Sequence, residues 1–225
     1  GVPLELRAII RDERDPQEKD GVIPGIRLLD TDFTDASFAE KLKPEKTGKV
    51  FNLIHLATHF RIGNTSADSG LLLGNGELLS LSSISKKSDF NFKNIDLLTL
   101  SACETGVSIG ESRGGEIESL GLLVQRKGAK AVLATLWKVA DASTAMLMSE
   151  FYRLRRENPT WTKSKAMQAA QLAMISGKLN PPTEGCANRA EIAGGNKQQA
   201  FAEDKCRQFA HPFYWSPFVL IGNWR

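Results

Sequence analysis

The stretch IDLLTLSACETG, residues 95–106, decides the fold, because an apolar run ends there in small, polar and reactive residues. The earlier stretch KVFNLIHLATHF, residues 49–60, has the same arrangement. Short runs that are apolar on both faces are typical of buried parallel strands. We therefore predict strands over 49–57 and 95–100, each followed by a segment with chemically reactive side chains.

Two further apolar runs, at 129–137 and 217–221, predict two more strands. Amphipathic patterns predict helices over about 116–128 and 162–176. A third helix is predicted between these two, with Asp141 or Ser143 as its N-cap. Strands that alternate with helices indicate an α/β fold, a mainly parallel sheet with helices on both faces.

Composition narrows the class of protein. The 225 residues are 41% hydrophobic and 24% charged with a net charge of +3, which is typical of a soluble globular domain. No apolar run is long enough to cross a bilayer, and the charge is too small to favour nucleic acid. The three cysteines, at 103, 186 and 206, are far apart and form no CxxC pair. We therefore expect a reducing, cytoplasmic location without a disulfide framework.

One domain boundary is expected, near residue 21. The charged stretch 11–20 is typical of a solvated loop, and the chain opens on GVPLEL rather than on methionine. We interpret residues 1–21 as the end of an upstream region and residues 22–225 as the domain. Within the domain, the aperiodic polar stretch at about 180–208 is predicted to be an insertion.

His59 and Cys103 each follow a predicted strand. In an open parallel sheet, sites lie beyond the carboxyl ends of the strands, and neighbouring strands are about 4.8 Å apart. The 44 residues between them allow a crossover that places the strands side by side. An imidazole beside a cysteine favours the nucleophilic thiolate, so a Cys–His dyad is feasible. Packing of a buried, inert Cys103 is the alternative.

Other kinds of site are disfavoured. His55 and His59 are spaced H-x3-H, but on a strand such residues are about 13 Å apart, so no metal site is predicted. His55 is instead interpreted as a core histidine with its hydrogen bonds satisfied. No Gly-Lys-Ser/Thr and no GxGxxG follows a strand, which argues against a nucleotide-binding doubly wound domain.

The segments HLATHF (55–60) and LSACETG (100–106) resemble the two signature motifs of the CHAT domain, a caspase-like peptidase domain often found downstream of tetratricopeptide repeats. Four more blocks follow the same family pattern in order. They are SGLLLGNGE (69–77), LATLWKVADASTAMLMSEFY (133–152), SKAMQAAQLAM (164–174) and HPFYWSPFVLIG (211–222). The resemblance implies a caspase-like α/β fold over about residues 22–225.

The resemblance also implies roles for individual residues. His59 corresponds to the general base and Cys103 to the nucleophile, with an oxyanion site formed by the backbone N–H groups of Cys103 and Phe60. Phe60 replaces the usual glycine, and its side chain is expected to narrow the cleft. Asp141 is either the floor of a pocket for a basic substrate residue or only the N-cap of a helix. Trp137 either borders the cleft or fills the core.

The function implied is that of a cysteine endopeptidase that cuts a protein or peptide substrate, after a basic residue if Asp141 selects it. We expect no metal and no organic cofactor, no membrane and no direct contact with nucleic acid. Upstream tetratricopeptide repeats or a regulatory protein are expected to keep such a domain latent. The alternative is a catalytically silent module that retains the fold for interaction or scaffolding.

Overall fold

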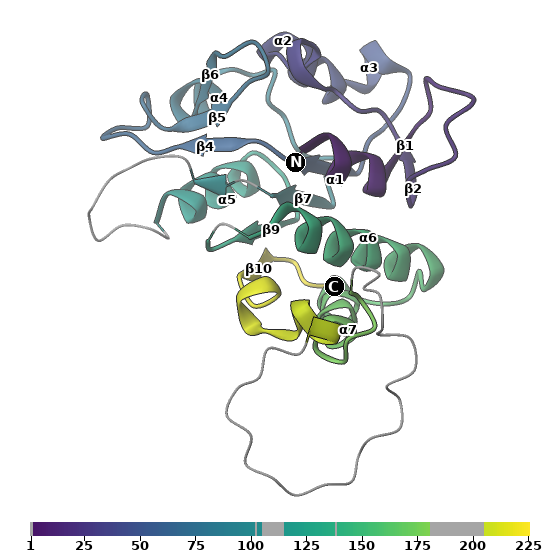
Figure 1. Cartoon of the computed structure of the whole chain (residues 1–225). Coiled ribbons are helices and arrows are strands. Elements are labelled where there is room, and N and C mark those ends of the chain that lie inside the picture. The colour runs from purple at the N-terminus through teal and green to yellow at the C-terminus, as the bar shows by residue number, and fades with distance from the viewer. Residues whose placement is uncertain (1, 102, 105–114, 138, 181–204) are drawn as a thin grey trace, which may run out of the picture.

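The computed structural model describes residues 2–101, 103–104, 115–137, 139–180 and 205–225. Its centre is a four-stranded sheet in the order β10-β9-β7-β3 (Figure 1). The strands are β3 (Leu53–Leu56), β7 (Leu97–Leu100), β9 (Ala131–Thr135) and β10 (Phe218–Gly222). The first three run parallel and β10 runs antiparallel to β9. All four predicted strands are confirmed, the first three with shorter bounds and the fourth shifted by one residue, as is the mainly parallel sheet.

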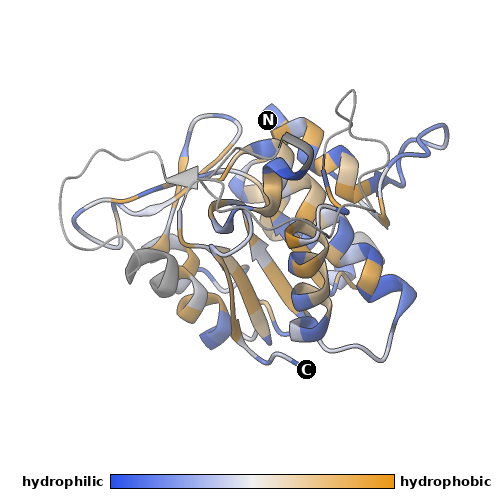
Figure 2. Ribbon diagram, turned by 60° about the horizontal axis from the view of Figure 1, so that its bottom comes forward, coloured by the Kyte–Doolittle hydropathy of each residue, from blue (hydrophilic) through white to orange (hydrophobic). Residues whose placement is uncertain are grey.

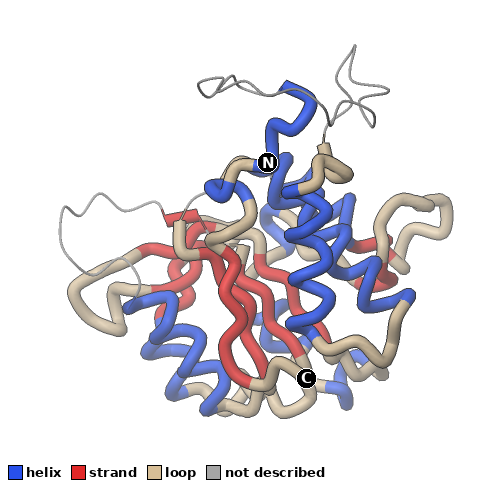
Figure 3. Tube along the Cα trace, turned by 90° about the horizontal axis from the view of Figure 1, so that it is seen from below, coloured by secondary structure: helices blue, strands red, loops and turns tan. Residues whose placement is uncertain are grey.

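Helices cover both faces of this sheet (Figure 3). Successive residues of a strand point to opposite faces, and all residues of β7 and β9 are buried. Leu98 and Val132 lie in one core with residues of α5 (Gly115–Arg126), whereas Leu97 and Leu133 lie in a second core. That second core includes residues of α6 (Asp141–Glu157) and α7 (Lys163–Ile175). The hydrophobic colouring of the central strands reflects this double burial (Figure 2).

The three main helices begin and end where local signals favour it. Thr162 is the N-cap of α7 and accepts a hydrogen bond from the backbone N–H of Lys165. Gly128 follows α5 with a φ of +114°, a conformation that only glycine adopts easily. Helix α6, however, has Ala140 as its N-cap with no side-chain cap. The prediction that Asp141 or Ser143 caps this helix is therefore wrong.

A second sheet, which the sequence analysis did not predict, lies beside the first. Its order is β6-β5-β4-β8, and its strands have two or three residues each. They are β4 (His59–Arg61), β5 (Gly70–Leu72), β6 (Leu78–Ser80) and β8 (Cys103–Glu104). Strands β5 and β6 form a hairpin whose turn is closed by Gly76, with a φ of +84°. The Asn-Gly pair between two leucine-rich runs is a signal for this hairpin.

The N-terminal residues pack on the main sheet through helix α1 (Val2–Ile9). Ile9 belongs to the core beneath α6, and the Ser149 hydroxyl donates to the carbonyl of Ala8. Strands β1 (Ile10–Asp12) and β2 (Ile23–Gly25) follow and pair in parallel. The interpretation of residues 1–21 as part of an upstream region stays a prediction, but their described part contacts the domain closely.

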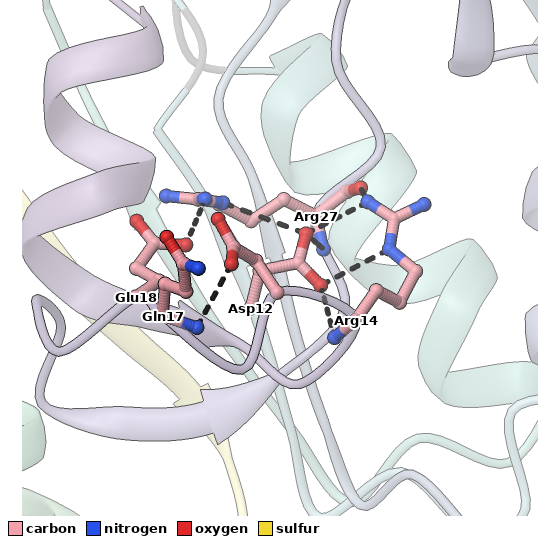
Figure 4. A network of polar contacts seen from close by, with 6 residues as sticks. Asp12, Arg14, Gln17, Glu18 and Arg27 are labelled. Atoms are coloured by element: carbon pink, nitrogen blue, oxygen red, sulfur yellow. Dashed lines mark hydrogen bonds and ion pairs between the residues drawn. The ribbon is translucent and has the colours of Figure 1, made fainter.

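The expectation that 11–20 is only a solvated loop is wrong at its start. Asp12 is 6% exposed and accepts three hydrogen bonds from Arg14, from the backbone N–H, Nε and Nη2 (Figure 4). Arg27 also forms ion pairs with Asp12 and Glu18. Two acids and two arginines thus neutralise each other between β1 and the chain after β2.

The remaining helices are short and lie around these sheets. They are η1 (Asp30–Asp32), α2 (Asp35–Lys41), α3 (Pro44–Thr47), α4 (Leu81–Lys86), η2 (Lys205–Ala210) and η3 (Pro212–Tyr214). Most of the predicted polar insertion, residues 181–204, lies outside the described residues. None of the described helices has the length and hydropathy that a membrane crossing requires.

Candidate active site

The register of the main sheet aligns the ends of three parallel strands. Leu56 of β3 pairs with Leu100 of β7, which in turn pairs with Ala134 of β9. The carboxyl ends of these strands therefore lie at one edge of the sheet. His59, Cys103 and Trp137 each follow their aligned residue by three positions, so all three leave the sheet at this edge.

His59 and Cys103 are brought together by the second sheet. Strand β4 pairs in parallel with β8, and His59 and Cys103 are register partners in that pairing. The backbone N–H of Ser101 donates to the carbonyl of Leu56 at 2.9 Å, which ties the two connecting segments together just before they enter the second sheet. The predicted neighbours, 44 positions apart in the sequence, thus lie opposite each other on adjacent strands.

His59 faces outward from β4. Its side chain is exposed, Phe60 is 2% exposed and Arg61 is exposed again, as expected for alternation along a strand. The Thr58 hydroxyl donates to the Leu72 carbonyl at 2.5 Å and fixes the connection just before His59. His59 therefore lies at the surface of a strand that pairs with a neighbour on each side.

Phe60 does not narrow the site. Its side chain lies in the hydrophobic core with Leu71 and Leu79, on the opposite face of β4 from His59. Among described residues other than glycine, only Asp30 has a positive φ, so the backbone of Phe60 is unstrained. The replacement of glycine is accommodated because the ring fills the core, and the expectation of a narrowed cleft is wrong.

Trp137 and Asp141 lie on the connection between β9 and α6. Trp137 is 39% exposed, so the interpretation that it fills the core is wrong. Its indole N–H donates to the carbonyl of Phe213 at 3.1 Å. Asp141 is exposed as the first residue of α6, where a carboxylate also stabilises the helix N-terminus. Both predicted substrate-binding residues are therefore at the surface on the β9 side of the site.

His55 is a core histidine, as predicted. Its Nε2 lies 2.8 Å from Glu5 Oε1, and its Nδ1 lies 3.1 Å from the Tyr152 hydroxyl. That hydroxyl also lies 2.7 Å from the hydroxyl of Thr99. Burial raises the pKa of Tyr152 far above its usual value, so the phenol stays neutral. This network joins α1, β3, β7 and α6 beneath the strand that leads to His59.

A cavity of about 860 Å³ lies on the β3 side of the site. It extends from Val2 and Leu6 of α1 along β3 to Thr58 and His59. In the described ranges, no three His, Cys, Asp or Glu side chains are grouped to hold a metal ion.

A mainly parallel α/β sheet, with a histidine and a cysteine in register beyond its strand ends, agrees with a caspase-like class of fold. The comparison with family models agrees, because the CHAT domain model matches residues 1–223. The chain belongs to the CHAT domain family, which includes caspase-like cysteine peptidases. The match includes residues 1–21, whereas the sequence pattern predicts that the domain begins at residue 22. No curated protein matches the chain significantly.

Proposed function

We propose that this domain is a cysteine endopeptidase in which Cys103 is the nucleophile and His59 the general acid and base. The observation that supports this most directly is the register pairing of His59 with Cys103 on parallel strands. Cα atoms of neighbouring strands are about 5 Å apart, a separation that an imidazole and a thiol can bridge. Membership of a family that includes cysteine peptidases supports the same assignment.

The reaction has two stages. The Cys103 thiolate attacks the peptide carbonyl carbon, and a C–S bond forms. The C–N bond then breaks as protonated His59 donates its proton to the departing amine, leaving a thioester. In the second stage, neutral His59 accepts a proton from water, which attacks the thioester. The acid is released and the thiolate is restored beside the protonated imidazole.

The other predicted site residues act on the substrate. The backbone N–H groups of Cys103 and Phe60 stabilise the oxyanion of the tetrahedral intermediate. The Asp141 carboxylate receives an Arg or Lys side chain before the cut, and its exposure on the β9–α6 connection supports this role. Replacement of Asp141 by Ala is expected to abolish a basic preference without unfolding the domain.

The decisive experiment compares the wild-type chain with Cys103→Ala in a mixed peptide library read by mass spectrometry. Cleavage is expected to fall by about 10³-fold or more in Cys103→Ala and to persist in the matched control Cys206→Ala. A thiol-reactive probe should label Cys103 faster than Cys206, and His59→Ala should remove that difference.

Latency and location complete the proposal. Upstream tetratricopeptide repeats or a regulatory partner hold the domain inactive until a signal releases it, and the reducing cytoplasm keeps the Cys103 thiol free. If the isolated domain is silent, the test moves to the full-length protein with its partner. Absence of cleavage by the full-length protein, together with equal labelling of the cysteines by the probe, would favour an interaction module without activity.

A further inference from the structure

An exposed apolar surface lies beside the strand-end site and joins Trp137 to two residues without an assigned role. Leu136, Trp137 and Phe213 are 41%, 39% and 46% exposed. The Trp137 and Phe213 rings contact each other with centroids 6.3 Å apart and planes inclined by 30°. The backbone N–H of Leu136 donates to the carbonyl of Pro217, which fixes this surface to the start of β10. We call Leu136, Trp137 and Phe213 the aromatic platform.

The platform is rigid because its aromatic rings continue into the core. Phe213 meets Tyr214 edge to face at 5.4 Å, and Tyr214 contacts Phe209, which is 3% exposed. His211 caps η3 by accepting the backbone N–H of Phe213 at its Nδ1. The only donor of the Trp137 indole is used by the Phe213 carbonyl. The outward surface is therefore ordered and apolar, which is typical of a binding surface.

The position of the platform suggests what binds there. Leu100 of β7 and Ala134 of β9 are register partners. Cys103 lies three positions after the first, and Trp137 lies three positions after the second. Asp141 is four positions after Trp137, so at most about 14 Å of chain separates them. An extended peptide advances about 3.4 Å per residue and covers that distance with four residues. One peptide can thus contact Asp141 and the platform together.

We propose that Trp137 and Phe213 form a substrate subsite for an aromatic or large aliphatic side chain, located within about four residues of the basic residue that Asp141 receives. This inference rests on the proposed function because the occupant is the peptide to be cleaved. The substrate class is then a polypeptide whose cleavage sequence combines one basic and one apolar side chain. Phe213 becomes a specificity residue, although it lies 76 positions from Trp137 in the chain.

The test measures binding to Cys103→Ala, so that it is independent of cleavage. A peptide library has one fixed arginine and one varied residue at each of the four positions on either side. Peptides retained by the immobilised protein are read by mass spectrometry. We expect about tenfold enrichment of Phe, Tyr, Trp or Leu at one position, and its loss in Cys103→Ala/Phe213→Ala.

The matched control is Trp224→Ala on the same Cys103→Ala background. Trp224 is 50% exposed and follows β10, which runs antiparallel to β9 and so ends at the opposite edge of the sheet. This variant should retain the enrichment. Absence of apolar enrichment, or enrichment that persists in the Phe213→Ala and Trp137→Ala variants, would overturn the subsite. Apolar enrichment that depends on Phe213, without Cys103-dependent cleavage even by the full-length protein with its partner, would show a peptide-binding surface and would refute the peptidase.

Discussion

Replacement of Asp12 by Asn tests the ion network that holds β1 to the chain after β2. The hydrogen bonds from Arg14 lower the pKa of Asp12 from 3.8 to about 2, against the opposing effect of burial. A shift of nearly two pKa units corresponds to about 2 kcal/mol of folding free energy at pH 7. Asp12→Asn should therefore unfold at lower urea concentration and melt about 4–8 °C below the wild type.

The pH dependence separates this effect from a simple loss of packing. A carboxyl with a lowered folded-state pKa stabilises the protein fully above 3.8, and this contribution is lost as the pH falls from 3.8 through about 2. The difference between wild type and Asp12→Asn should shrink to about 1 kcal/mol at pH 3. Asp15→Asn removes the same charge from an exposed position nearby and should change stability by less than about 0.5 kcal/mol. Equal effects of the two variants, or a difference independent of pH, would refute the reasoning.

Two further pairs of substitutions test the core and the turns by thermal melting. Tyr152→Phe removes a buried hydroxyl with two hydrogen-bonding neighbours and should cost about 1–3 kcal/mol, whereas Tyr214→Phe, at a half-buried ring, should be nearly neutral. A smaller loss from the first than from the second would contradict the buried network. Gly74→Ala places a Cβ atom 1.5 Å from the Asp30 carbonyl oxygen and should lower the folding stability by about 3 kcal/mol or more. In Gly76→Ala the Cβ atom meets no atom within 4 Å. This variant should lose only about 1 kcal/mol, because of the φ of +84°. Equal melting temperatures for the two glycine variants would show that the loop moves aside.

The main sheet was predictable because burial on both faces leaves a clear pattern in the sequence. Runs such as LLTL and AVLAT have no polar residue on either face apart from threonine, and the structure buries every residue of both. The second sheet was not predictable, because strands of two or three residues are too short to show an alternation of apolar and polar residues. Its one strong signal is Asn75-Gly76 between leucine-rich runs, within the family block SGLLLGNGE.

Contacts between residues that are far apart in the chain could not be predicted from the sequence. Asp12 looked like part of a solvated loop because its buried partner, Arg27, is 15 positions away. Glu5 and His55 are 50 positions apart, so no local pattern shows that an acid on the first helix meets the histidine of the first motif. Charge runs predict exposure only on average, and tertiary pairing decides which members are buried.

The strand-end register gives the proposed site two different sides. Because β7 lies between β3 and β9, the segment that follows it has the His59 connection on one side and the Trp137 connection on the other. The side of His59 is tied by Thr58 to a strand end and carries the imidazole that we propose for proton transfer. The side of Trp137 ends in an exposed aromatic surface fixed by β10 and η3. Chemistry and substrate selection can therefore vary independently, since they depend on different strands of one rigid sheet.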